Sequence, residues 1–164
     1  MKPQIATASK VIPAPAPIVY KIIADYRKTH LAILPKPYFL SLDVEEGGVG
    51  EGTIVQFQMR ILGQTQSFRA LITEPEPGRV LQETDMDMQV PTTFTVQPLG
   101  HENHTKVTIQ TELKNRGFME GLLAKLLLQK IYGKELGLLA EIAENFKEAM
   151  PSTSEAKTLS IASK

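Results

Sequence analysis

The chain of 164 residues has the length of one domain with a sizeable core, and its 18 Lys and Arg balance 18 Asp and Glu. This neutral charge argues against a protein that holds nucleic acid or anionic membranes by electrostatic attraction. The absence of cysteine excludes disulfides, thiolate metal sites and thiol nucleophiles. Neither a signal-peptide pattern nor an 18-residue apolar run is found, so we expect a cytoplasmic protein without a membrane span.

The first fifth of the chain predicts one strand and two short helices. Residues 7–12 are compatible with a β-strand, and three prolines at alternate positions then exclude a helix or a central strand. Apolar residues at helical spacing predict a helix over residues 17–25 that begins with a proline. A second helical stretch, residues 27–34, ends where two further prolines follow.

The middle of the chain predicts antiparallel strands, because apolar and polar residues alternate there. The predicted strands cover residues 39–44, 53–62, 66–72, 79–84, 92–99 and 104–113. The glycine-rich loop over residues 47–52 lacks the Lys-Ser/Thr pair of a phosphate-binding loop, so we interpret it as a turn.

Two hairpins give the strand register. A turn at Gly63 and Gln64 predicts the facing pairs Ile61–Gln66, Met59–Phe68, Phe57–Ala70 and Val55–Ile72. Arg60 and Arg69 then point away from the apolar face of this hairpin. A four-residue loop over residues 100–103 predicts a second hairpin, with the facing pairs Phe94–Ile109 and Val96–Val107.

The apolar period becomes helical over residues 117–149 and predicts one long helix. Pro151 ends this pattern, and the polar, aperiodic residues that follow are typical of a loosely held tail. We therefore expect a single domain over residues 1–150 and a polar tail over residues 151–164.

The stretches IPAPAPIVYKIIADY, EEGGVGEGTIVQF, ITEPEPGRVLQETD and TTFTVQPLG, together with the long helix, resemble the START-like, Bet v 1-like helix-grip superfamily. Within it, the chain is similar to the bacterial polyketide cyclase/dehydrase and lipid-transport-like (SRPBCC) proteins. The resemblance implies an α+β helix-grip fold, in which a curved antiparallel sheet of about seven strands wraps around the C-terminal helix. It also implies a cavity between sheet and helix that holds a small apolar molecule.

The apolar strand face and the long helix supply the candidate wall of that cavity. Spacing alone favours a filled core for these residues, whereas the resemblance implies that they line a ligand site. They are Val55, Phe57, Met59, Phe68, Ala70, Phe94, Val96, Val107, Ile109, Tyr132 and Leu136.

The proline-bounded segment over residues 26–38 is a candidate gate, because it is too short for a self-stable helix. An ordinary connector packed on the sheet is the alternative interpretation. With the start of the long helix, this segment predicts a cavity rim formed by Tyr26, His30, Leu34, Tyr38, Phe118 and Met119.

Catalysis requires positioned polar groups inside the cavity. The predicted register leaves no strand arginine pointing inward, which departs from the interior arginines of ring-forming relatives. The remaining polar candidates, interpreted as hydrogen-bonding or packing residues, are Tyr26, His30, Tyr38, Gln66, Gln82 and Tyr132. Glu83, Asp85 and Asp87 are interpreted as a solvated strand end, and the loop over residues 101–104 is interpreted as a hairpin tip without metal.

These patterns predict a protein that binds a small hydrophobic molecule, such as a lipid, an aromatic compound or a polyketide-like compound. A cyclase, aromatase or dehydratase is one alternative, and a protein-interaction module is another. We expect no cofactor, no metal and no nucleic-acid partner, and a monomer or weak homodimer.

Overall fold

The computed structural model describes residues 2–100, 103–114 and 117–149, so the predicted tail lies outside the described residues. In chain order the elements are β1 (Gln4–Ile12), α1 (Ala16–Ala24), α2 (His30–Ile33), β2 (Phe39–Glu46), β3 (Ile54–Ile61), β4 (Gln64–Glu76), β5 (Val80–Asp85), β6 (Pro91–Pro98), β7 (Thr105–Leu113) and α3 (Phe118–Ala149).

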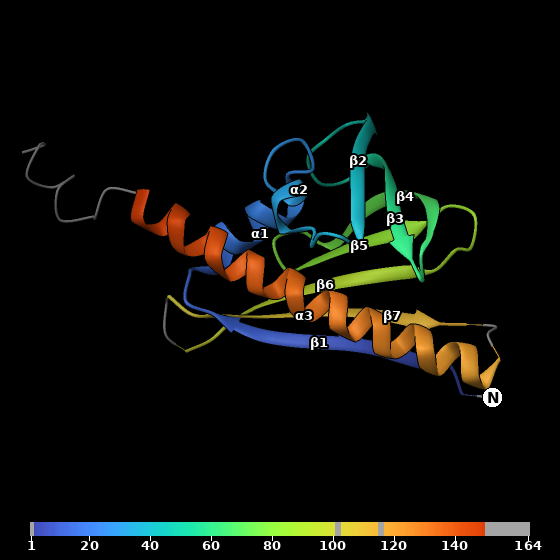
Figure 1. Cartoon of the computed structure of the whole chain (residues 1–164). Helices are drawn as coiled ribbons and strands as arrows, with labels where there is room; N and C mark the ends of the chain where they lie inside the picture. The colour runs from blue at the N-terminus through green and yellow to red at the C-terminus, as the bar shows by residue number, and fades with distance from the viewer. Residues whose placement is uncertain (1, 101–102, 115–116, 150–164) are drawn as a thin grey trace, which may run out of the picture.

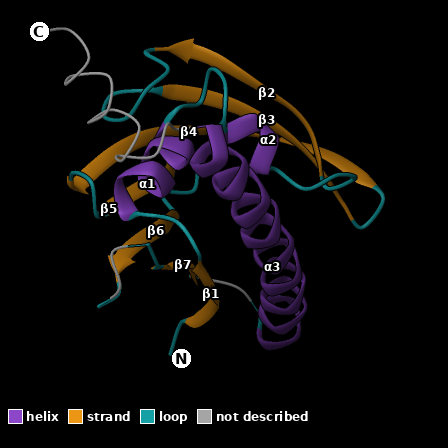
Figure 2. Cartoon of the chain, turned by 90° about the vertical axis from the view of Figure 1, so that its left-hand side faces the viewer, coloured by secondary structure: helices purple, strands orange, loops and turns teal. Residues whose placement is uncertain are grey.

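The strands form one antiparallel sheet in the order β1-β7-β6-β5-β4-β3-β2. The first strand therefore lies beside the last, and α3 packs along β1. Figure 1 shows α3 crossing the sheet diagonally, and Figure 2 shows the sheet curving around this helix. The predicted α+β architecture, with a curved sheet around a long C-terminal helix, is confirmed.

The turn of the first hairpin lies one residue earlier than the sequence predicts. Leu62 and Gly63 form it, with φ angles of 49° and 80°. A type I′ turn requires positive φ at both of its central residues, and the glycine fits the second position. The facing pairs are consequently Ile61–Gln64, Met59–Gln66, Phe57–Phe68 and Val55–Ala70, so the predicted pairing is wrong by two residues.

A shift of two residues keeps every side chain on its face of the sheet. Arg60 and Arg69 are accordingly exposed on the outer face, as predicted, and Nε of Arg69 lies 2.6 Å from Oε2 of Glu45. In the second hairpin, Phe94 faces Ile109 as predicted.

The glycine loop over residues 47–52 is a turn, as predicted. Gly47, Gly48, Gly50 and Gly52 all have positive φ angles. A side chain at Gly48 would also collide with the side chain of Arg27, which packs directly on this glycine. The loop thus requires glycine for its backbone shape and for close packing.

The second short helix is shorter than predicted. The sequence predicts a helix over residues 27–34, whereas α2 covers only four residues. Oδ1 of Asp25 accepts hydrogen bonds from the backbone N–H groups of Arg27 and Lys28. Residues 26–29 form a turn, in which the Asp25 carbonyl oxygen accepts hydrogen bonds from the N–H groups of both Thr29 and His30, and the helix begins only after it.

The two halves of the inner sheet face differ in their covering. At one end, α1 packs against β6 and α3, and α2 packs against α3, which closes the core. At the other end, the N-terminal half of α3 lies over the sheet without a neighbouring helix (Figure 2). Three helices therefore cover the inner face at one end, and α3 alone covers it at the other.

Candidate functional site

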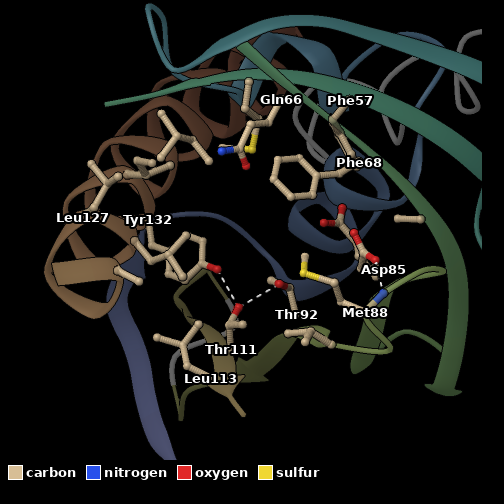
Figure 3. Close-up of a pocket in the computed structure, with 18 of the residues that line it drawn as sticks. Phe57, Gln66, Phe68, Asp85, Met88, Thr92, Thr111, Leu113, Leu127 and Tyr132 are labelled. Carbon is tan, nitrogen blue, oxygen red and sulfur yellow. Dashed lines mark hydrogen bonds between the residues drawn. The ribbon is translucent and has the colours of Figure 1, made fainter. Parts of the chain in front are cut away.

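A cavity of about 1210 Å³ occupies the space under the N-terminal half of α3. Most of its wall is apolar and comes from both layers, including Phe57, Met59, Phe68, Ala70 and Phe94 from the sheet and Leu123, Leu127, Leu128 and Ile131 from α3. Figure 3 shows Phe57, Phe68 and Met88 pointing into the cavity opposite Leu127 and Tyr132. The polar lining residues are Gln66, Glu83, Asp85, Gln89, Thr92, Thr111, Lys114, Glu120, Tyr132 and Glu135.

Some of the predicted wall residues lie in the packed core instead. Phe57, Met59, Phe68, Ala70, Phe94 and Tyr132 line the cavity. The other five are fully buried and are not among the residues that line this cavity: Val55, Val96, Val107, Ile109 and Leu136. The four strand residues share the inner face of the sheet but lie towards the end that the two short helices cover. Strand alternation predicts the face on which a side chain lies but not its position along the strand.

The mouth of the cavity lies elsewhere than predicted. Leu62, Met88 and Leu123 line it and are each about half exposed or more, which places the opening between two hairpin turns and α3. Of the predicted gate segment, only Leu34 reaches the cavity. This arrangement favours the alternative interpretation of the segment as a connector packed on the sheet.

The other predicted rim residues occupy different places. Tyr26 and His30 are buried in the core. Tyr38 is half-buried, and the amine of Lys134 lies 5.6 Å from the centre of its ring. Met119 is exposed and does not line the cavity. The side chain of Phe118 lies outside the described residues.

Glu83 connects the cavity to a buried polar cluster. Its Oε1 accepts a hydrogen bond of 2.6 Å from the Tyr26 hydroxyl and lies 3.3 Å from Nε2 of His30. Nδ1 of His30 lies 2.7 Å from the carbonyl oxygen of Ile23. Because a carbonyl can only accept, Nδ1 carries the proton of the neutral imidazole, and Nε2 presents its lone pair to Glu83. The Tyr26 and His30 rings stack at 4.1 Å, which fixes this geometry.

Burial determines whether Glu83 or His30 carries the shared proton of this cluster. It raises the pKa of Glu83 to about 7, against the opposing effect of the Tyr26 hydrogen bond. It also lowers the pKa of His30 to about 4. A neutral His30 beside a protonated Glu83 therefore fits the site better than an ion pair, and the Glu83 side chain, 14% exposed, remains accessible from the cavity.

Glu135 of α3 is the second carboxyl of the cavity. The residue is 3% exposed, and none of the described residues hydrogen-bonds or ion-pairs with it. Burial, followed by the charge of Glu83, raises its pKa well above the ordinary value. The two carboxyls, from opposite walls, therefore influence one another's ionisation.

The prediction that Glu83 and Asp85 belong to a solvated strand end is wrong. Both line the cavity, whereas Asp87 is exposed. Strand alternation predicts that both side chains point inward, because they lie on the same face of the strand as Leu81, which is fully buried. Glu135 was missed, although its place one helical turn from Ile131 puts it on the apolar stripe of the helix.

Three hydroxyls form a chain on another part of the wall. Tyr132 Oη lies 2.5 Å from Oγ1 of Thr111, which lies 2.7 Å from Oγ1 of Thr92 (Figure 3). Burial raises the pKa of Tyr132 to about 12, so its hydroxyl stays protonated. Of the predicted polar candidates, Gln66 also lines the cavity, whereas Gln82 bonds to Thr93 outside it.

The described part of the cavity wall holds few cationic side chains. Among the described lining residues, the only cationic side chain is Lys114, which is exposed, and none is arginine. No group of three or more His, Asp or Glu residues in the described part of the chain could hold a metal ion. No described helix is long and apolar enough to cross a membrane.

A curved sheet that holds a long helix over an internal cavity defines a helix-grip protein. Residues 3–144 match the family model described as "Polyketide cyclase / dehydrase and lipid transport", and the chain belongs to this family. A search of curated proteins finds no match.

Solved structures share the fold at low sequence identity. The KanY protein superposes with a TM-score of 0.77 at 23% identity, over 88% of this chain and 99% of that chain. The Zhui aromatase/cyclase from Streptomyces sp. R1128 gives 0.72 at 14% identity, over 90% and 97% of the two chains. A START superfamily protein from Mycobacterium smegmatis gives 0.66 at 16% identity, over 87% and 98%.

Proposed function

We propose that this protein binds a small, largely apolar molecule in the cavity between the sheet and α3. The observation that carries the proposal is the cavity itself, about 1210 Å³ in volume with mainly apolar walls. Pockets for small molecules typically measure about 300–1,000 Å³ and combine apolar walls with a few placed polar groups. The carboxyls of Glu83 and Glu135 and the Tyr132 hydroxyl are such groups, and they orient the polar end of the ligand.

The test combines native mass spectrometry of the purified protein with displacement of a fluorescent hydrophobic probe, 1-anilinonaphthalene-8-sulfonate or the uncharged N-phenyl-1-naphthylamine. Ala70→Leu adds bulk inside the cavity and is expected to weaken binding of the uncharged probe at least tenfold. Ala32→Leu makes the same change at an exposed position of α2 and is expected to leave binding unchanged. Equal binding by both variants and the wild type would place the probe outside the cavity.

A second candidate function, a cyclase- or dehydratase-type enzyme, is supported by the acid–base cluster. Protonated Glu83 can donate its proton to the hydroxyl of a bound β-hydroxyketone, which leaves as water. The Glu83 carboxylate then accepts the proton lost from the carbon beside the carbonyl, which forms the double bond and restores the acid. Loss of water from a β-hydroxyketone needs such a donor at the leaving hydroxyl.

The enzyme hypothesis is tested with 4-hydroxy-4-phenylbutan-2-one, whose dehydration product is followed by ultraviolet absorbance. Catalysis that Glu83→Gln abolishes while probe binding persists would support an enzyme. Turnover equal to that of buffer for the wild type, with probe binding intact, would leave the protein as a binder of this class of compound.

A further inference from the structure

The charge of the cavity wall restricts the chemical class of the ligand. Glu83 from β5 and Glu135 from α3 bring two carboxyls to one mainly apolar space. The described lining offers one cation, Lys114, and it is exposed at the end of β7. The interior wall therefore carries acidic groups without a fixed positive partner.

Glu135 adds an independent observation. Its side chain is almost wholly buried, lines the cavity and has no hydrogen-bond donor among the described residues. A buried carboxyl without a partner destabilises a fold, and a leucine at this point of the apolar stripe would avoid that cost. The structural role of α3 thus does not account for a glutamate here, whereas a partner supplied by the ligand does.

Tyr26 and His30 fix the orientation of the Glu83 carboxyl. The Tyr26 hydroxyl donates to Oε1, and His30 packs at 3.3 Å, so the carboxyl keeps one orientation towards the cavity. The rings of Phe57, Phe68 and Phe94 line the same space and favour a cationic or aromatic group beside them.

We infer that the ligand carries a basic nitrogen, and that its ammonium group lies between the carboxyls of Glu83 and Glu135. This inference rests on the proposed binding function and names its ligand class, a hydrophobic amine. The positive charge of an ammonium group stabilises the ionised form of both carboxyls. The group then donates charge-assisted hydrogen bonds to them, which are stronger than bonds between neutral groups. A ligand carboxylate or phosphate, by contrast, finds no buried cationic side chain among the described lining residues.

The remaining titratable groups around this place do not replace that role. His30 is neutral and directed at Glu83, the tyrosine hydroxyls remain protonated, and Oδ1 of Asp85 accepts the backbone N–H groups of Asp87 and Met88. The groups that face the two carboxyls or line the same wall are Tyr26, His30, Asp85, Lys114, Glu120 and Tyr132.

Three probes of one shape test the inference: 2-naphthylmethylamine, 2-naphthalenemethanol and 2-naphthoate, titrated calorimetrically into the full chain. The amine is expected to bind at least tenfold more tightly than the alcohol, and the carboxylate more weakly than both. Amine affinity is expected to rise from pH 6 to pH 8 as Glu83, whose pKa burial raises to about 7, ionises, while alcohol affinity stays level.

Variants separate this inference from the binding function itself. Glu135→Gln is expected to lower amine affinity at least tenfold and to leave alcohol affinity unchanged. Glu144→Gln, at an exposed position of the same helix, is the control and is expected to change neither affinity. Tight binding of the alcohol or the carboxylate, equal to that of the amine, overturns the inference but not the binding function. No binding by any of the three probes counts against both.

Discussion

The Tyr26 hydroxyl donates a 2.6 Å hydrogen bond to Oε1 of Glu83, across 57 residues of the chain. Tyr26 lies in the turn that follows α1, and Glu83 lies on the cavity face of β5. The contact therefore ties the filled end of the molecule to the acidic wall of the cavity. It also favours the ionised form of Glu83, because a donor stabilises negative charge.

Removing this donor is predicted to raise the pKa of Glu83 further above its ordinary range. Tyr26→Phe keeps the ring stacked on His30 but deletes the hydroxyl, so the carboxylate loses its hydrogen bond. Carbon-13 NMR titration of labelled glutamate carboxyls measures the shift, expected to be about one unit.

Tyr20→Phe is the matched control for this experiment, because the Tyr20 hydroxyl donates to Glu74, which does not line the cavity. The Glu83 titration is expected to be the same in Tyr20→Phe and the wild type. An unchanged Glu83 titration in Tyr26→Phe would show that the hydroxyl does not tune this carboxyl.

Glu135→Gln is predicted to stabilise the protein at alkaline pH. The pKa of Glu135 is raised in the folded state, so its contribution to stability is present below the unfolded pKa of about 4.5 and is lost as the pH rises through the folded pKa. Urea denaturation is expected to show a variant about 1–3 kcal/mol more stable than the wild type at pH 8. The two proteins should differ less at pH 4.5, and a pH-independent difference would contradict the assignment.

His30→Phe is predicted to destabilise the fold by about 1–3 kcal/mol at pH 7. The variant keeps an aromatic ring beside Tyr26 but leaves the buried carbonyl of Ile23 without its donor. Thermal or urea unfolding measures the loss. Stability equal to that of the wild type would indicate that water replaces the imidazole as donor.

Leu62→Asn is predicted to stabilise the first hairpin. Leu62 takes a φ of 49° and is 85% exposed, a conformation that asparagine adopts at lower cost than leucine. The expected gain is about 0.5–1 kcal/mol, or about 1–4 °C in Tm for a domain of this size. Leu40→Asn, at a partly exposed position in β2, is the control and is expected to be destabilising.

The sequence predicted side-chain faces more securely than positions along the strands. Alternation placed Phe94 opposite Ile109 and kept Arg69 outside even though the first turn was misplaced. It could not separate Met59, which lines the cavity, from Val55, which lies in the core, because both share one face of β3. That difference depends on where α1 and α2 pack, a long-range property.

The acidic groups were misinterpreted for a different reason. Charge is typical of solvated positions, and this general tendency outweighed the period of the strand at Glu83 and of the helix at Glu135. The structure shows that periodicity was the better guide for both residues.

The pairing of β1 with β7 affects how the chain reaches this fold during synthesis. Ser9 bonds to Thr108, 99 residues later, so the earliest strand leaves the ribosome long before its neighbour exists. Hairpins such as β3–β4 need only local contacts, whereas closing the edge at β1 requires a long loop. Until β7 emerges, β1 has no hydrogen-bonding neighbour, and its Ala6 and Ile12 side chains, which are buried in the folded chain, stay exposed.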